Sequence, residues 1–360
     1  MQALCLHRIQ PPPRHYSASR DVFGRYMSSI VSRLTLGAVG LTCKTFLNSG
    51  YCAAVTVNGF EHLQKALQDE RRKGGRGVVT ISNHISTLDD PLTWGILPWR
   101  WYFQQGMVRW SLGAADIIFT NPVFSAFFRQ GQTLETFRGK GIYQPAVDTA
   151  IDNLNRGEWI HLFGEGKVHQ PGHYPPKPQP SAESSATHVP DTNQLLHSPS
   201  KGKDPPLLLR FKWGLGRILM EAEQPPTIIP MWLTGFEKLM PEGRNWPYKF
   251  FPRRGVALSV NFGEPIPGDE VRRRLWEASE RGGVSTLAAG SELTVGDPAQ
   301  EERSVAKAGQ RWLGDIVQHR MHEPSEDSKQ KRIARLRSEI TAVLQQEVEA
   351  LGRRVLDAKS

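Results

Sequence analysis

The sequence predicts an α/β fold in which helices cover a mixed β-sheet. Short apolar runs of β type alternate with helical patterns through the middle of the chain, as in sheets covered by helices. The 360 residues, 39% of them hydrophobic, can supply the core of one large domain with insertions, or of two small domains. A helical segment is predicted at each end of this region.

Residues 1–26 form a basic amino-terminal segment. Four arginines accompany a single acidic residue, Asp21, with serines between them. This composition is similar to that of mitochondrial targeting segments. Three consecutive prolines, at positions 11–13, would interrupt an amphipathic helix there.

Residues 27–49 are predicted to form a membrane-associating helix. The uncharged stretch between Arg33 and Lys44 is about half the roughly 20 residues that span a bilayer, so a simple transmembrane helix is not expected. The two cations project within about 20° of each other. They oppose apolar positions at Val31, Ala38, Val39 and Phe46. Such a helix would lie in the interface or enter one leaflet, and a core helix is the alternative.

Residues 50–279 contain the predicted α/β domain. It starts with a strand at 53–57, a helix at 59–72, a loop at 73–76 and a strand at 77–82. Further strands are predicted at 133–137, 158–163, 226–233 and 256–262.

Two insertions and a final helix complete the organisation. Residues 168–206 hold nine prolines and almost no large apolar residue, so this insertion cannot form a core. Residues 280–329 are a second polar insertion, with a short helix expected over 306–321. Residues 330–358 carry apolar residues at helical spacing and predict an amphipathic carboxy-terminal helix, which docks on the domain or on a membrane.

Charge and cysteine content restrict the partners. A formal net charge of +9 favours an anionic partner, namely nucleic acid, an acidic lipid surface or a phosphorylated substrate. Ten tryptophans and fifteen phenylalanines beside many cations fit a membrane interface. The three cysteines form no Cys-x-x-Cys pair, so neither a disulfide framework nor a zinc site is supported.

The segment Asn83-His84-x-x-x-x-Asp89-Asp90-Pro91 is a candidate catalytic pair. Residues five apart on a regular helix point about 140° from each other, so His84 and Asp89 meet only outside a continuous helix. Pro91 suits the first helical position and Asp90 the N-cap, which leaves His84 in a loop. A histidine held by a carboxylate suits a general base, whereas a capped turn without chemistry is the alternative.

Three further motifs follow predicted strands. Phe163-Gly164-Glu165-Gly166-Lys167 permits close backbone approach and offers a cation, but it lacks the spacing of a Walker loop. Arg138 ends a strand, and Arg210 and Lys212 occupy alternate positions. No His-Glu-x-x-His or Gly-x-Ser-x-Gly occurs, and His169 and His173 have no evident supporting ligands, so neither a metal nor a serine nucleophile is expected.

In this order the motifs resemble those of the glycerolipid acyltransferase family. That family has an Asn-His-x-x-x-x-Asp block, a strand ending in arginine, a Phe-Pro-Glu-Gly turn and an apolar strand with proline. The segments 83–91, 163–168, 209–214 and 229–232 are most similar to its phospholipid-transacylase branch. The resemblance covers roughly residues 28–267, apart from the proline-rich insertion. Gly164 replaces the family's proline and should loosen the turn.

The resemblance implies a glycerolipid-acyltransferase-like fold and acyl transfer between a phospholipid and a lysophospholipid, with neither CoA nor another cofactor. Cardiolipin and phosphatidylcholine are the characteristic pair. His84 would act as the base and Asp89 would orient it, while backbone NH groups of residues 164–166 would stabilise an oxyanion. The residues implied in substrate binding are Asn83, Arg138, Gly164, Glu165, Gly166, Lys167, Arg210 and Lys212.

The resemblance also implies a location and leaves rivals open. Members attach to mitochondrial membranes facing the intermembrane space, on the outer leaflet of the inner membrane or the inner leaflet of the outer membrane. Nucleic acid is not expected as a partner, and a homo-oligomer is left open. The rival functions are an acyl-CoA-dependent lysophospholipid or glycerol-phosphate acyltransferase and a non-catalytic protein that binds anionic lipid.

Overall fold

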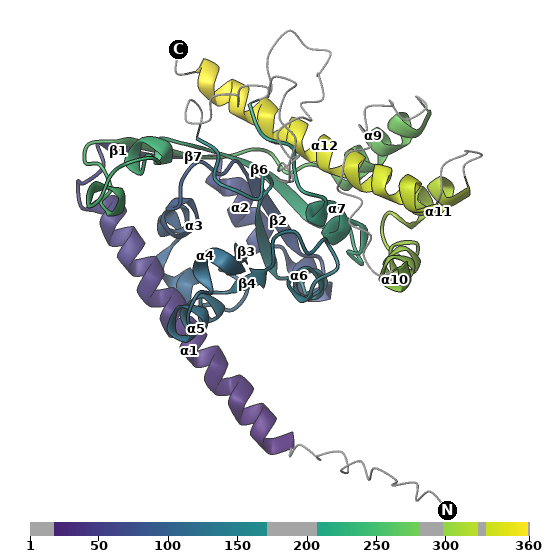
Figure 1. Ribbon diagram of the computed structural model, residues 1–360, viewed down its shortest axis with the longest axis horizontal. Coiled ribbons are helices and arrows are strands. Elements are labelled where there is room, and N and C mark those ends of the chain that lie inside the picture. The colour runs from purple at the N-terminus through teal and green to yellow at the C-terminus, as the bar shows by residue number, and fades with distance from the viewer. Residues whose placement is uncertain (1–17, 171–206, 281–297, 323–328, 359–360) are drawn as a thin grey trace, which may run out of the picture.

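A computed structural model of the chain describes residues 18–170, 207–280, 298–322 and 329–358, and shows one seven-stranded sheet (Figure 1). The strand order is β1-β7-β6-β2-β5-β3-β4. Neighbouring strands are parallel except β6 and β7, so the predicted mixed sheet is confirmed. The strands are β1 Ala54–Asn58, β2 Val78–Ser82, β3 Trp110–Ala114, β4 Thr133–Thr136, β5 Trp159–Phe163, β6 Thr227–Thr234 and β7 Ala257–Phe262.

Helices cover both faces of the sheet and bury its central strands. Val78 and Val79 of β2 are both fully buried, although they point to opposite faces and belong to separate core clusters. Such two-sided burial is typical of parallel strands. One cluster includes side chains of α1 Ala18–Asn48, α2 Phe60–Leu67 and α3 Asp89–Thr93. The other includes side chains of α6 Pro145–Asn155, α7 Trp213–Met220, α9 Gly268–Glu280 and α12 Lys329–Asp357.

Short helices connect these elements. The predicted helix at 59–72 is α2 followed by a separate 3-10 turn, so it ends earlier than expected. The connecting helices are η1 Glu70–Gly74, η2 Trp94–Ile96, η3 Trp99–Phe103, α4 Ala115–Ile118, α5 Pro122–Gln130, α8 Phe236–Leu239 and η5 Tyr248–Phe250.

Six strands agree with the prediction to within two residues, whereas β3 was not predicted. Its sequence, WSLGA, contains a glycine and a serine and has no β-branched residue, so its β propensity is weak. The glycine has a packing reason, because a Cβ on Gly113 would lie 2.3 Å from the Ile118 side chain and 2.6 Å from that of Thr133. Tertiary packing therefore forms this strand where local preference does not.

Helix α1 begins at Ala18, earlier than the predicted start at 27, and the rest of the basic segment lies outside the described residues. Within it, the 19 residues Ile30–Asn48 have a mean hydropathy of 1.3, and 22% of that stretch is buried. By length and composition this stretch could cross a membrane, as well as lie in an interface. The short uncharged run alone therefore does not exclude a span.

One side of α1 packs closely on the domain. A Cβ on Gly37 would meet the ring of Phe103 at 2.3 Å, and one on Gly40 would meet the ring of Tyr102 at 2.5 Å. Lys44 donates a hydrogen bond to the Gly95 carbonyl at 3.2 Å, so this cation faces the domain. Apolar residues on the other side stay exposed, at 43% for Val31, 61% for Leu34 and 40% for Leu41.

The carboxy-terminal part of the chain adds three helices to the core. In place of one short helix over 306–321, the structure has α10 Pro298–Ala308 and α11 Gly314–His322. Trp312, between them, is buried beside α12, so part of the expected polar insertion is core, while residues 281–297 and 323–328 lie outside the described residues. The predicted carboxy-terminal helix is confirmed as α12. It docks on the domain, because Leu336, Ile340 and Leu344 are fully buried.

We expect Gly40→Leu to lower the free energy of unfolding by about 1–3 kcal/mol, because the new side chain must displace the Tyr102 ring. Urea denaturation of the detergent-solubilised protein measures the change. Ala38→Leu is the matched control, since Ala38 is exposed on the same helix and should tolerate leucine. Equal destabilisation by both substitutions would contradict this packing.

Candidate active site

His84 and Asp89 meet at the carboxyl end of β2. Their side chains are joined by a contact of 3.0 Å between His84 Nδ1 and Asp89 Oδ2. The same carboxylate oxygen accepts hydrogen bonds from the backbone NH groups of Ile85 at 2.6 Å and Ser86 at 2.8 Å. The imidazole stacks on the Phe163 ring, with centroids 4.0 Å apart. As predicted, the loop between His84 and Asp89 folds the carboxylate back onto the ring.

This contact determines which imidazole nitrogen is open. Burial raises the pKa of the fully buried Asp89 carboxyl, although His84 and the two NH groups lower it in part. When Asp89 is ionised it only accepts hydrogen bonds, so His84 Nδ1 carries a proton, and in the neutral tautomer Nε2 has the free lone pair. Among the described residues none forms a hydrogen bond with Nε2, and the side chain is 20% exposed.

The predicted helix cap is wrong in detail. Helix α3 begins at Asp89 and its N-cap residue is Leu88, so Asp90 is not the cap and Pro91 is not the first helical residue. Asp90 instead forms an ion pair through both carboxylate oxygens with buried Arg109, which directly precedes β3. Burial opposes the ionisation of Asp90, but Arg109 outweighs it and lowers the pKa of this carboxyl to about 2. Sequence reasoning missed Arg109 because it missed β3.

Glu165 is a buried connecting residue at the turn after β5. Its side chain is 1% exposed. One oxygen accepts a hydrogen bond from the His84 backbone NH at 3.1 Å; the other accepts from the Leu209 NH at 3.0 Å and contacts His169 Nδ1 at 3.1 Å. The register explains the first bond, because Ser82 pairs with Phe163 and each functional residue lies two positions further along. Glu165 therefore holds the loop of His84 and the chain at Leu209 beside this turn, and its part in substrate binding stays a prediction.

Asn83 is also held by backbone contacts, and its part in substrate binding stays a prediction. Its amide donates to the Leu233 carbonyl at 3.0 Å and accepts from the Leu233 NH at 2.8 Å. The side chain is 2% exposed. Asn83 thus continues the pairing of β2 with β6 beyond the end of β2, which fixes the direction in which the chain leaves toward His84.

The glycine turn has two of its backbone donors already engaged. The NH groups of Gly164 and Gly166 donate to the carbonyls of Ser82 at 3.4 Å and Phe163 at 3.0 Å. In this conformation the predicted oxyanion contact is therefore not available from these two groups. A Cβ on Gly164 would lie 2.6 Å from the Phe211 ring, so the residue that replaces the family's proline accommodates this ring closely.

The predicted cations are divided between the site and its surroundings. Lys212 lies beside the turn, because its NH donates to the Gly164 carbonyl at 2.9 Å and its stem packs on Gly166. Lys167 is half-buried and continues the turn. Arg210 contacts Ser338 on α12 at 2.7 Å, and Arg138 pairs with Asp116 at 3.6 Å beyond β4, two strands from β5.

His169 and Gln170 belong to the site although they were assigned to the insertion. The His169 NH donates to the His84 carbonyl at 2.6 Å. The Gln170 side chain is 1% exposed and donates to the carbonyls of Ile85 at 2.8 Å and Met240 at 3.0 Å. The proline-rich composition begins only after these residues, which is the signal that would have placed the boundary later. Residues 171–206 lie outside the described residues.

A buried histidine, His161, lies behind the site on β5. Trp159 donates to Thr80 Oγ1, which lies 2.8 Å from His161 Nδ1, and His161 Nε2 lies 3.4 Å from Ser82 Oγ. Because Ser82 Oγ donates to the Asn83 carbonyl, the chain of donors is satisfied only by a neutral His161 with its proton on Nε2. Burial lowers the pKa of His161 to about 3.

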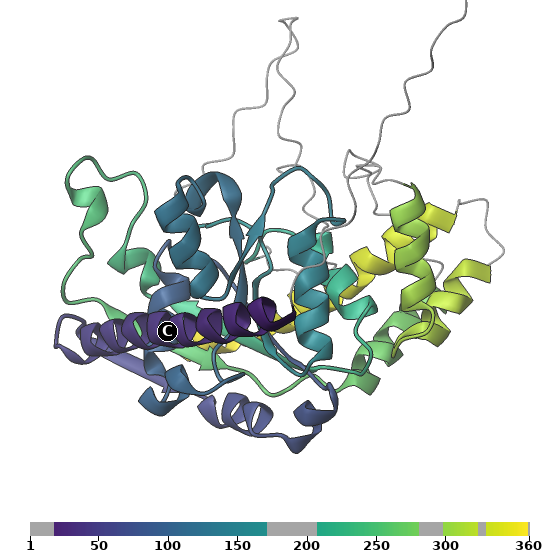
Figure 2. The same cartoon turned by 90° about the horizontal axis from the view of Figure 1, so that it is seen from below.

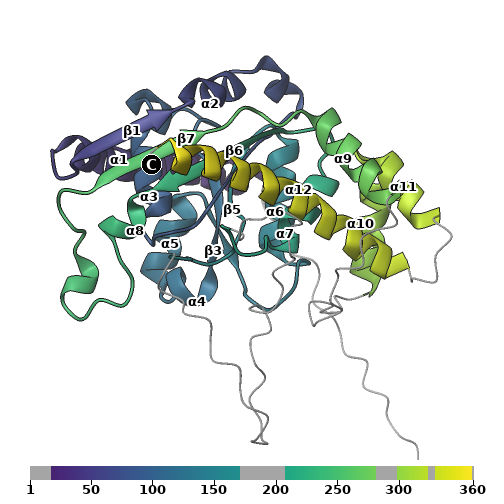
Figure 3. The ribbon, with the colours of Figure 1, turned by 90° about the horizontal axis from the view of Figure 1, so that it is seen from above.

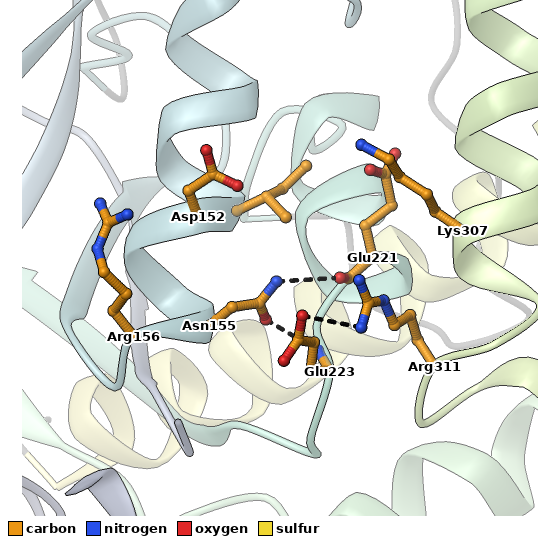
Figure 4. Close-up of a pocket in the computed structure, with 8 residues that line it drawn as sticks. Asp152, Asn155, Arg156, Glu221, Glu223, Lys307 and Arg311 are labelled. Atoms are coloured by element: carbon orange, nitrogen blue, oxygen red, sulfur yellow. Dashed lines mark hydrogen bonds and ion pairs between the residues drawn. The ribbon is translucent and has the colours of Figure 1, made fainter. Parts of the chain in front are cut away.

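A polar hollow of about 280 Å³ lies elsewhere, where α6 and α7 end (Figure 4). Glu223 pairs there with Arg311 at 2.8 Å, and Asn155 contacts the backbone next to Glu221. The chain enters β5 and β6 from these helix ends, so the hollow lies at the amino edge of the sheet, whereas α/β sites form at the carboxyl edge. Among the described residues, no group of three or more His, Cys, Asp or Glu side chains is arranged for a metal ion.

The chain is similar to known acyltransferases. Residues 54–234 match the model of the acyltransferase family. A Dictyostelium discoideum protein named taffazin is 34% identical over 237 residues, which cover 65% of this chain and 68% of that protein. Saccharomyces cerevisiae tafazzin is 34% identical over 264 residues, covering 71% and 66%. N-acylphosphatidylethanolamine synthase of Arabidopsis thaliana is 31% identical over 245 residues, covering 68% and 73%.

The match spans half of the chain and includes the strands that carry His84 and Glu165, so the protein is an acyltransferase. Within that class, the extent and identity of the similarity show that the chain belongs to the tafazzin family. The matched segments span about two thirds of those two relatives.

We expect Glu165→Gln to destabilise the fold by about 1–3 kcal/mol and to lower activity, because an amide donor would face two other donors. Urea denaturation and an acyl-transfer assay measure the two effects. Glu135→Gln is the control: this carboxylate pairs with exposed Arg129, and its loss should cost less than about 1 kcal/mol. Similar losses in both variants would remove the special role of Glu165.

Acid stability should depend on His161. Below its ordinary pKa of 6.5 the unfolded chain takes up a proton that folded His161 refuses until pH 3, so stability present above pH 6.5 is lost as the pH falls. The loss should reach about 1.4 kcal/mol per pH unit. His161→Gln should flatten the curve of unfolding free energy against pH by this slope. Parallel curves for the two proteins would contradict the assignment.

Proposed function

We propose that the protein is a CoA-independent transacylase that moves a fatty acyl chain from a phospholipid to a lysophospholipid. The observation that carries this proposal is the contact of His84 Nδ1 with Asp89, which orients the imidazole at the carboxyl edge of the sheet and leaves Nε2 open. A general base of this kind activates a hydroxyl without a covalent enzyme intermediate. The tafazzin relatives support the lipid substrates.

The proposed reaction passes through one tetrahedral intermediate. His84 Nε2 takes the proton of the lysophospholipid hydroxyl while that oxygen attacks the carbonyl carbon of the donor ester. Asp89 stabilises the imidazolium that forms. The intermediate then collapses, the bond from the carbonyl carbon to the donor glycerol oxygen breaks, and this oxygen takes the proton back from Nε2. The products are a new phospholipid and a new lysophospholipid, and the enzyme is unchanged.

The same base therefore serves both directions of transfer, as an exchange reaction requires. We propose cardiolipin and phosphatidylcholine as the exchanging pair, with mitochondrial membranes facing the intermembrane space as the location; both rest on the family resemblance. Lys167 and Lys212 beside the turn would bind phosphate groups, which suits the net charge of +9. The exposed apolar side of α1 supports membrane attachment.

A second candidate acceptor follows from the plant relative, whose name specifies N-acylation of phosphatidylethanolamine. An amine could replace the hydroxyl as the nucleophile at His84. Transfer from acyl-CoA remains the rival that differs in the donor. Assays with different acyl donors and acceptors distinguish these two activities from the proposed exchange.

We expect His84→Ala to reduce CoA-free exchange by about 100-fold or more, which is the usual contribution of a general base. The assay follows a labelled acyl chain from phosphatidylcholine to monolysocardiolipin in the absence of CoA. Asp89→Asn should also lose activity, because it removes the ionised acceptor of the Nδ1 proton.

His322→Ala is the control, since this exposed histidine lies on α11, away from the carboxyl edge. Parallel reactions with acyl-CoA as donor, or with phosphatidylethanolamine as acceptor, identify the rival activities. Undiminished exchange by a folded His84→Ala protein would refute the catalytic role of His84.

A further inference from the structure

A loop between α8 and β7 exposes four aromatic side chains. We call residues 244–251 the aromatic loop. The exposed fractions are 76% for Trp246, 69% for Tyr248, 62% for Phe250 and 62% for Phe251. Aromatic residues of this size are mostly buried in soluble domains, so a cluster of them on one loop indicates a binding surface.

The aromatic loop is held in a defined shape. Arg244 donates to the carbonyls of Pro241 at 3.2 Å and Phe251 at 2.8 Å, which ties the two ends of the loop together. Beyond it, the Tyr51 hydroxyl donates to the Pro252 carbonyl at 2.6 Å. The aromatic side chains are therefore presented by a closed loop that already has its own hydrogen bonds, and little ordering is needed on binding.

The aromatic loop projects from the same side of the sheet as the candidate site. Figures 2 and 3 show this loop and helices α4 and α5 on one side, which is also the side toward which the strands end. The chain order agrees with this placement, since helix α4 starts directly after strand β3 ends. Gln170 connects the two regions, because it contacts Ile85 next to His84 as well as Met240 and Glu242 before the loop.

Helices α4 and α5 add a second apolar surface on this side. We call its exposed residues the α4–α5 patch: Ile117 at 56%, Val123 at 75%, Phe124 at 53% and Phe127 at 46%. The patch adjoins α1, where Ser32 donates to the Gln130 carbonyl at 2.7 Å. Helix α1 therefore lies beside α5.

The charge of the aromatic loop selects the partner. Lys249, Arg253 and Arg254 are exposed, and no acidic residue occurs between Arg244 and Val256. Amphipathic rings beside cations match the headgroup region of a bilayer, where rings enter the interface and cations meet lipid phosphates. A protein partner would need acidic residues placed opposite these cations, whereas the phosphate groups of an anionic bilayer supply negative charge over its whole surface.

We propose that the aromatic loop and the α4–α5 patch dock the carboxyl edge of the sheet on an anionic phospholipid bilayer. Docking of this kind places His84 at the lipid surface, independently of α1. The binding step does not require the proposed transacylase activity, while its effect on catalysis rests on that function.

The test compares the full chain with a variant in which Trp246, Tyr248, Phe250 and Phe251 are changed to serine. Co-sedimentation uses vesicles of phosphatidylcholine alone and vesicles of phosphatidylcholine with phosphatidylglycerol. We expect the variant to bind the mixed vesicles at least about tenfold more weakly, because it loses several rings that would be buried in the bilayer interface. A control with Val57→Ser and Leu356→Ser removes exposed apolar residues elsewhere and should bind normally.

A charge variant, Lys249→Glu with Arg253→Glu and Arg254→Glu, should lose the preference for the anionic vesicles and the salt dependence of binding. The loop variant should keep its thermal midpoint and its exchange activity on detergent-dispersed lipids, but lose activity on vesicles. Unchanged vesicle binding by the loop variant would overturn the proposal. A wild-type protein that is dimeric in solution, together with a loop variant that is monomeric, would also overturn it, since the surface would then be an interface between two copies. Loss of activity in detergent as well as on vesicles would also count against it.

Discussion

The geometry of the candidate site depends on one buried carboxylate, that of Glu165. Its two oxygens join the β5 turn to the His84 backbone and to Leu209, on two other segments of the chain, and to the His169 ring four residues further along. A carboxylate in the interior is stable only when donors replace its lost hydration. The carboxylate needs these donors, and in turn it holds the segments that supply them in place. The loop that bears His84 is positioned in this way.

Two adjacent aspartates at the start of α3 differ in their partners, and their pKa values are shifted in opposite directions. Neighbouring helical residues point about 100° apart, so Asp89 faces the loop of His84 while Asp90 faces β3. Asp89 has only the ring and two backbone NH groups as partners, and burial keeps its pKa raised. Asp90 has a full cation, Arg109, and its pKa is lowered. Asp89 orients the His84 ring, and Asp90 anchors helix α3, which carries both aspartates, to strand β3.

Much of the fold followed from local pattern, and the exceptions have physical causes. The six predicted strands are apolar runs that need no partner to be recognised. Strand β3 has weak β propensity and is held by pairing with β4 and β5, and its Gly113 lies where neighbouring side chains leave no room for a larger residue. Composition also misled at the ends of the insertions. His169 and Gln170 are polar yet buried by contacts to distant carbonyls, and Trp312 is core within a polar stretch. The composition of a segment predicts how exposed its residues are on average, but it does not predict hydrogen bonds to residues far away in the sequence.

The site was predictable as a set of motifs but not as a set of roles. The His84–Asp89 pair follows from spacing, because only a broken helix lets the two meet. Asn83 and Glu165 have the same chemistry whether they face a substrate or the backbone, and only the pairing of β2 with β5 and β6 decides between these. The order of the strands depends on the whole sheet, so a short sequence motif does not predict which strands will be neighbours. Polar motif residues at the ends of central strands are therefore to be assigned first to the backbone beside them, and to substrate only when that backbone is already satisfied.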